Sequence, residues 1–221
     1  MARKVLASHT SGSSEIVLWE NDMDGMREYE LVINGVFIMA SYNHLSSELL
    51  VRNVMKPGAD RRVLIGGLGM GYTVKEACSC QDVVQVDVVE IEPVIIAWNR
   101  TWFKNINRDC LADERVKVIE ADFYDYVRHC ENYYDLVSMD IDNGPMMLVN
   151  DHNSRVYRSE FFREISELLK PGGIFAIWSC DHDADLASEA AEVFRECQVH
   201  EVTEEHNGHK IPYYIYFCYK G

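Results

Sequence analysis

Long apolar segments are missing from this sequence of 221 residues. No run approaches the roughly 20 apolar residues that a helix needs to cross a bilayer. The first residues, Met1 to His9, also lack the extended apolar stretch of a secretory signal. We therefore expect a cytoplasmic protein that does not associate with membranes.

Positive charge is also scarce. The chain has 21 Lys and Arg against 36 Asp and Glu, which gives a formal net charge of −15. Proteins that bind nucleic acid rely on clusters of Lys and Arg to contact phosphates, so a nucleic-acid partner is not expected. The negative charge favours a cationic small molecule as ligand, although many proteins carry such charge only as a solvated surface.

The cysteines do not form a recognisable framework. There are seven, an odd number, scattered along the chain. Cys78 and Cys80 are the only close pair, and no second pair of Cys or His lies at the spacing of zinc ligands. His200, His206 and His209 lie among acidic residues, but this stretch has the pattern of a polar hairpin. We expect reduced structural thiols and no metal site.

The composition is that of a folded domain. Hydrophobic residues make up 48% of the chain and charged residues 26%, close to the average of globular proteins. The length suits one substantial domain of about 100–200 residues with a small addition. The change in pattern divides the chain into a small antiparallel β extension with a helix at 1–55 and a larger α/β domain at 56–221, on which the motifs described below place nucleotide binding and catalysis.

The first part alternates apolar and polar residues. Residues 15–20, 29–33 and 36–39 are predicted strands, and Asn34-Gly35 is a typical two-residue hairpin turn. A helix should follow, with Ser46 or Ser47 near its N-cap and Leu49, Leu50 and Val54 on one face. Lys56-Pro57-Gly58 should end it.

The second part alternates strands and helices, which predicts a parallel sheet covered by helices. The helices should begin near Thr73, Pro93, Phe123, Ser159 and Asp185. The predicted strands are residues 63–65, 84–89, 116–119, 134–139, 173–178 and 213–219. The fold class is therefore α/β, Rossmann-like, with a mostly parallel sheet.

A glycine-rich turn joins the first of these strands to a helix. Its sequence is Gly66-Gly67-Leu68-Gly69-Met70-Gly71. Glycines permit a tight turn and let a ligand approach main-chain amides at a helix N-terminus. The turn predicts a nucleotide-type ligand bound by Gly66, Gly67, Gly69 and Gly71, although some such turns only pack closely.

Acidic residues follow the next two strands. Glu90 ends the second strand, roughly 20 residues after the turn, where a carboxylate accepts hydrogen bonds from ribose hydroxyls. Asp122 follows the third strand and could accept a hydrogen bond from an adenine amino group. It is equally suited to cap the helix that begins at Phe123.

A third acidic segment follows the fourth strand. Asp140, Asp142 and Asn143 place two carboxylates and an amide on one turn at the mouth of the predicted site. Paired carboxylates there could orient or deprotonate an amine nucleophile. Alternatively they are turn residues before Gly144-Pro145.

Together these segments resemble a known family. The glycine turn, Val89-Glu90-Ile91-Glu92, residues 115–122, residues 134–140 and the run Leu169-Lys170-Pro171-Gly172-Gly173 are similar to class I S-adenosylmethionine-dependent transferases. Within that superfamily the chain most resembles the spermidine and spermine synthases, the aminopropyltransferases. The N-terminal hairpin and Ser46-Ser47-Glu48-Leu49 extend the resemblance over nearly the whole chain.

The resemblance implies roles for individual residues. Glu90 would bind the ribose hydroxyls, Asp122 the adenine amino group, and Asp140, assisted by Asp142, would activate the attacking amine. Glu48 and Asn143 would contact the substrate. The co-substrate would be S-adenosylmethionine or its decarboxylated form, the acceptor a small-molecule amine, and the N-terminal hairpin resembles one that supports homodimers.

The chain departs from the family pattern at several positions. Gly69 stands where the aminopropyltransferase motif GGGDGG has its aspartate, and Ile38 stands where they have a glutamine. Their Pro-Thr-Tyr-Pro segment has no counterpart in this sequence. Two alternatives to aminopropyl transfer therefore stay open, a small-molecule methyltransferase and a catalytically silent nucleoside-binding scaffold.

Overall fold

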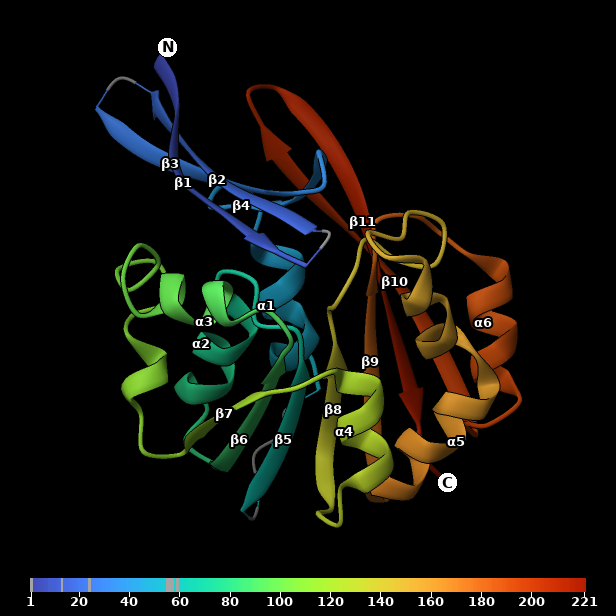
Figure 1. The fold of residues 1–221 in the computed structure, drawn as a ribbon. Helices are drawn as coiled ribbons and strands as arrows, with labels where there is room; N and C mark the ends of the chain where they lie inside the picture. The colour runs from blue at the N-terminus through green and yellow to red at the C-terminus, as the bar shows by residue number, and fades with distance from the viewer. Residues whose placement is uncertain (1, 13, 24, 55–57, 59) are drawn as a thin grey trace.

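The computed structural model describes residues 2–12, 14–23, 25–54, 58 and 60–221, and it contains two β-sheets (Figure 1). The N-terminal sheet is antiparallel, in the order β1-β2-β3-β4. Its strands are β1 (Ala2–Ser11), β2 (Ser14–Met23), β3 (Met26–Ile33) and β4 (Val36–Ala40). Asn34 and Gly35 join β3 to β4 with φ of 52° and 79°, the left-handed conformation that a two-residue hairpin turn requires. The predicted hairpin is confirmed.

The larger sheet has seven strands in the order β10-β11-β9-β8-β5-β6-β7. The five strands from β9 to β7 are parallel, and β11 and β10 extend this sheet as an antiparallel hairpin. The strands are β5 (Arg61–Gly66), β6 (Val83–Glu90), β7 (Val116–Glu120), β8 (Tyr134–Met139), β9 (Leu169–Ser179), β10 (Glu196–His206) and β11 (His209–Tyr219). The predicted α/β class with a mostly parallel sheet is confirmed.

The helices begin within one residue of the predicted positions, apart from the first. They are α1 (Leu45–Arg52), α2 (Tyr72–Ser79), α3 (Pro93–Asn99), α4 (Phe123–His129), α5 (Ser159–Leu168) and α6 (Ala184–Ala191), with 3-10 segments at Cys110–Ala112 and Asp151–Tyr157. None of the helices in the described ranges is long and apolar enough to cross a membrane.

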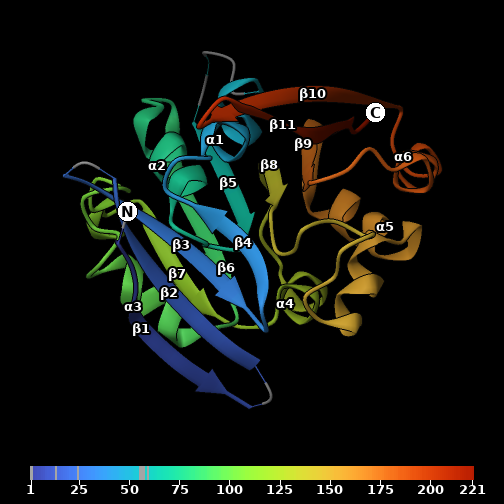
Figure 2. The ribbon, with the colours of Figure 1, turned by 90° about the horizontal axis from the view of Figure 1, so that it is seen from above.

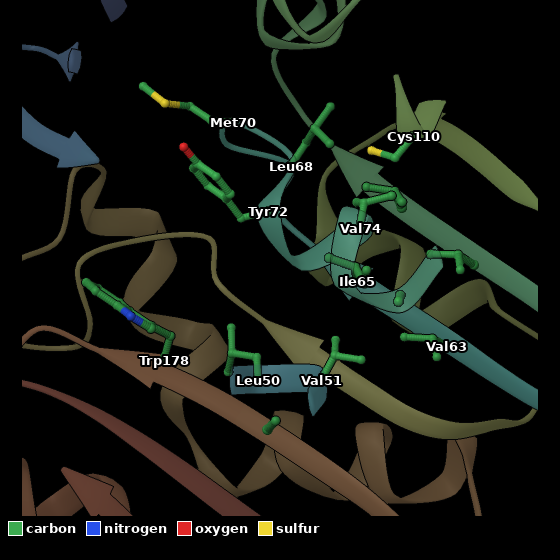
Figure 3. Close-up of a cluster of buried hydrophobic side chains, with 14 of the residues drawn as sticks. Leu50, Val51, Val63, Ile65, Leu68, Met70, Tyr72, Val74, Cys110 and Trp178 are labelled. Carbon is green, nitrogen blue, oxygen red and sulfur yellow. The ribbon is translucent and has the colours of Figure 1, made fainter. Parts of the chain in front are cut away.

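Successive side chains of the central strands point to opposite faces of the sheet, so the hydrophobic core is divided between the two faces. Val63 and Ile65 of β5 join the hydrophobic cluster that contains α1, α2 and α3, and Figure 3 shows them beside Leu50 and Val51 of α1. Leu64, between them, joins the second cluster with α4, α5 and α6. A strand buried on both faces therefore appears as a continuous apolar run.

Helix α1 differs from the prediction at its start. Its N-cap is His44, whose side chain makes no capping hydrogen bond, and Ser46 and Ser47 lie in the first turn. The two hydroxyls instead donate to distant carboxylates, Ser46 to Glu204 and Ser47 to Asp140. The predicted stop at Lys56-Pro57 lies outside the described residues.

Candidate active site

The loop after β5 and the loop after β8 lie side by side. Strands β6 and β7 follow on one side of β5, whereas β8 lies on its other side, so the strand order reverses between β5 and β8. Open α/β sheets bind their ligands in the crevice that such a reversal creates at the carboxyl ends of the strands. Gly67 and Asp140 line a cleft at this point, with about 1390 Å³ of empty space including its open mouth.

The glycine turn has two kinds of glycine. Gly67 and Gly69 line the cleft and adopt left-handed backbone conformations, with φ of 90° and 50°. Gly66 and Gly71 are absent from the cleft wall; a Cβ at Gly66 would overlap the ring of Phe123, and one at Gly71 would crowd the side chain of Asn99. Close packing therefore accounts for these two, and only Gly67 and Gly69 are placed to contact a ligand.

Glu90 lines the cleft at the end of β6 and is only 9% exposed. Its carboxylate accepts hydrogen bonds from the backbone N–H of Leu68, at 2.9 Å, and of Glu92, at 2.9 Å. Burial raises the pKa of Glu90, and these backbone donors partly oppose the shift. Glu90 thus fixes the glycine turn and still borders the cleft, where its remaining lone pairs are suited to a ribose diol.

Asp122 combines the two functions that its sequence position allows. One carboxylate oxygen accepts from the N–H of Tyr124 at 2.8 Å and caps α4. The other accepts from the guanidinium of Arg155 at 2.7 Å. The predicted helix cap is confirmed, and Asp122 also lines the cleft beside the end of β7. An adenine contact therefore stays a prediction for this residue.

Asp140 is the least engaged carboxylate of the third acidic segment. It follows β8 and lines the cleft. Among the described residues its carboxylate accepts one hydrogen bond, from the hydroxyl of Ser47 at 3.1 Å. The surrounding protein raises the pKa of Asp140 to about 6, and the Ser47 hydrogen bond opposes that rise. A carboxylate with free lone pairs and a pKa near neutrality is suited to accept a proton.

Asp142 has a different environment from Asp140. It accepts hydrogen bonds from the backbone of Asn143 and Val149 and from the amide of Asn153, at 2.9, 2.7 and 2.8 Å. Burial raises its pKa, and these donors oppose the shift. The carboxylate therefore anchors the loop from Asn143 to Asn153. Asn143 lines the cleft and donates its amide to the carbonyl oxygen of Phe37, which ties this loop to β4.

Glu48 is not brought into the cleft. Its carboxylate accepts from Lys75 at 2.6 Å and from Arg52 at 2.8 Å, and these cations lower its pKa despite burial. The substrate contact expected for Glu48 is therefore not supported. The acidic residue that follows Ser46 and Ser47 instead links α1 to α2.

Several cleft residues escaped the sequence analysis. The N-terminal sheet contributes Leu31, Ile33 and Met39, together with Ile38, noted above only as a departure from the family pattern, and β9 contributes Trp178. These residues lie in ordinary apolar strands, and nothing local distinguishes them from core positions. Figures 1 and 2 show the N-terminal sheet lying across the carboxyl ends of the parallel strands, which brings them to the site.

The charge of the cleft wall is of one sign. Its described residues include five carboxylates and no Lys, Arg or His. The carboxylates belong to Glu90, Glu92, Asp122, Asp140 and Asp142. A low-dielectric cleft lined by one sign of charge attracts ligands of the opposite sign. In the described ranges, the cleft included, no group of three or more His, Cys, Asp or Glu is arranged to hold a metal ion.

The fold is that of the class I S-adenosylmethionine-dependent methyltransferases. Solved structures agree with it: the spermidine synthase of Thermotoga maritima superposes with a TM-score of 0.79 at 22% identity, covering 98% of this chain and 73% of that one. A spermidine synthase in complex with the transition-state analogue AdoDATO gives a TM-score of 0.81 at 23% identity, with 98% and 74% covered.

The sequence comparisons define the family. The profile of the spermine/spermidine synthase domain matches residues 43–199, and the chain belongs to this family. A polyamine aminopropyltransferase of Prochlorococcus marinus is 26% identical over 182 residues, which are 80% of this chain and 60% of that protein. One from Synechococcus is 31% identical over 132 residues, 58% of this chain and 40% of the relative. The chain thus spans about half the length of these relatives.

Proposed function

We propose that this protein transfers an aminopropyl group from decarboxylated S-adenosylmethionine to a small-molecule amine. The observation that carries the proposal is the charge of the cleft wall, which has five carboxylates and no cationic side chain among its described residues. The decarboxylated donor bears a sulfonium and an ammonium and no negative group. S-adenosylmethionine itself carries a carboxylate, which would find no cationic partner in this wall. The names of the relatives support the same activity.

The reaction requires two contributions from the protein, namely alignment of the two substrates and removal of a proton from the amine. The lone pair of the acceptor amine attacks the carbon next to the sulfonium sulfur, a C–N bond forms, and the C–S bond breaks. Its electron pair stays on sulfur and leaves as the neutral thioether 5′-methylthioadenosine. The nitrogen releases a proton, and we assign Asp140 as its acceptor because this carboxylate lines the cleft and has a raised pKa. Alignment of donor and acceptor supplies much of the remaining acceleration.

Binding measurements on the whole chain test the choice of donor. By calorimetry, decarboxylated S-adenosylmethionine should bind at least ~10-fold more tightly than S-adenosylmethionine, because only the latter buries an unpaired carboxylate. The common product, 5′-methylthioadenosine, should bind as well. Tighter binding of the carboxylated donor would indicate a methyltransferase, and no binding of any of the three would indicate a silent scaffold.

The variant Glu90→Gln tests the ribose assignment. A hydrogen bond to a charged group contributes about 1.5–3 kcal/mol, so 5′-methylthioadenosine should bind ~10-fold to 100-fold more weakly. Glu120→Gln is the matched control, since Glu120 pairs with Glu90 in register at the end of the adjacent strand, is exposed and does not line the cleft. Equal affinities of the two variants would remove Glu90 from the ribose role.

A further inference from the structure

The cleft has a floor and a roof of different character. The floor, formed by the carboxyl ends of β5, β6, β7 and β8 and the loops that follow them, contains all five carboxylates. The roof is the part contributed by the N-terminal sheet, namely Ser14 of β2, Leu31 and Ile33 of β3, and Ile38 and Met39 of β4. Four of its five side chains are aliphatic or thioether, and the fifth, that of Ser14, is uncharged. A ligand that reaches from floor to roof therefore passes from acidic to apolar surroundings.

Met39 shows how closely the roof approaches the glycine turn. Its sulfur accepts the backbone N–H of Met70 at 3.1 Å and lies 2.6 Å from the place that a Cβ at Gly69 would occupy. Met39 therefore fills the space in which a side chain at position 69 would project. The roof and the glycine turn are thus in direct contact at Met39.

The two carboxylates that lie behind the roof end of the cleft, Glu204 and Glu48, are bound by other groups of the protein. Beside the roof the cleft is lined by neutral polar groups of Asn43, Ser46 and Ser47. Behind them, Glu204 accepts both the N–H and the hydroxyl of Ser46, at 2.9 and 2.7 Å. Glu48 is occupied by Lys75 and Arg52, as described above. The acids next to this end of the cleft are therefore already engaged.

Trp178 provides independent evidence on which ligand groups the cleft can bind. It is 8% exposed, lines the cleft, and its Nε1–H has no hydrogen-bond partner among the described residues. The ring of Tyr213 packs against it with centroids 5.2 Å apart. An indole N–H is a donor only, so it cannot pair with an ammonium, which is also a donor only. It can pair with an acceptor atom of a ligand, and it therefore disfavours an ammonium at this place.

We infer that the acceptor substrate is a primary monoamine with an uncharged, largely apolar tail, and that a diamine is disfavoured. This inference rests on the proposed function. The amine would lie at Asp140 and the tail under Ile38 and Met39. Each buried CH₂ should strengthen binding about fourfold, whereas a second ammonium would lose its hydration without gaining a partner.

A matched pair of amines tests the inference. n-Hexylamine and 1,6-diaminohexane differ only in the terminal group, and each is titrated calorimetrically into the whole chain saturated with 5′-methylthioadenosine. We expect n-hexylamine to bind at least ~10-fold more tightly. Equal or tighter binding of the diamine overturns the inference, and so does the absence of binding by either amine.

Parallel assays with decarboxylated S-adenosylmethionine separate this inference from the proposed function. Tight n-hexylamine binding without transfer overturns the proposed function and supports the acceptor class. Transfer to the diamine in preference to n-hexylamine supports the proposed function and overturns the acceptor class.

A variant of the roof gives a second test. Ile38→Asp places a carboxylate in the roof and should reverse the preference, so that 1,6-diaminohexane binds more tightly than n-hexylamine. Phe37→Asp is the control, because Phe37 is the preceding residue of β4, is 39% exposed and does not line the cleft; its preference should equal that of the unaltered protein. A folded Ile38→Asp protein that still prefers n-hexylamine contradicts the inference. If this variant does not fold, the comparison of the two amines on the unaltered chain still decides.

Discussion

Replacing Asp140 by asparagine should lower kcat by ~10²-fold to 10⁴-fold, the usual contribution of a general base. Asn has nearly the same shape and can still accept the hydrogen bond from Ser47, but it cannot take the proton that the amine releases. The rate is measured as 5′-methylthioadenosine formed from decarboxylated S-adenosylmethionine and an amine acceptor. Asp142→Asn is an informative comparison, since Asp142 anchors the loop through three donors. It should change the thermal stability as well as the rate.

The pH dependence provides a check on the same assignment. Because the pKa of Asp140 is raised to about 6, the base is inactive below that pH, and the rate should rise as pH increases through 6. The Asp140→Asn variant should lack this inflection. An inflection that persists in the variant would show that another group accepts the proton.

As pH increases, the contribution of Asp140 to the thermal stability should fall, whereas its contribution to the rate should rise. A carboxyl whose pKa is higher in the folded than in the unfolded chain favours folding while it is protonated. This contribution is lost as pH rises from about 4 towards 6. Asp140→Asn should therefore have a higher Tm than the unaltered protein at pH 8 and a similar Tm at pH 4. Lower activity together with higher stability would separate a catalytic loss from unfolding.

The sequence was sufficient to predict the parallel sheet and its helices, because strands buried on both faces are continuous apolar runs. It did not reveal β1. Residues such as Arg3, Lys4 and His9 are mostly exposed on this edge strand, so no apolar alternation distinguishes it from a loop. The pairing of Ala2 with Asp22 and of Ser11 with Ser14 determines the strand, and pairing is not a local property.

The acids of the candidate site were predictable because each directly follows an apolar strand. Their partners were not. Ser47 meets Asp140 across 93 residues of sequence, and the roof residues come from a separate sheet. Glu48 shows the limit of an assignment by resemblance, because its distance of four residues from Arg52 already indicated a helical ion pair. The third residue of this ion-pair cluster, Lys75, comes from α2 and could not be inferred from spacing along α1.

Replacing Gly67 by alanine should have the largest effect of any single change in the glycine turn. Gly67 has φ of 90°, and a Cβ there would overlap the backbone carbonyl oxygen of Asp140. The backbone N–H of Asp140 donates to the carbonyl of Gly66 at 2.9 Å, so the overlap falls where β5 and β8 are joined. A shift of either backbone would therefore change the distance between the glycine turn and Asp140, the proposed base. A displacement of about 1 Å at a catalytic site can cost ~10²-fold, and we expect kcat/KM to fall by at least that factor.

Gly172→Ala is the control that separates backbone strain from overlap. Gly172 has φ of 73°, and a Cβ there would meet no atom within 4 Å. Both alanines should be destabilising by ~1–2 kcal/mol because the left-handed conformation is unfavourable for residues with a Cβ. This loss is measured as the free energy of unfolding in urea. Gly67→Ala should lose more than that and should also weaken binding of 5′-methylthioadenosine, whereas Gly172→Ala should bind it normally. Equal effects of the two substitutions on stability and binding would mean that Gly67 serves only the turn, and that the close approach of Gly67 to Asp140 does not organise the site.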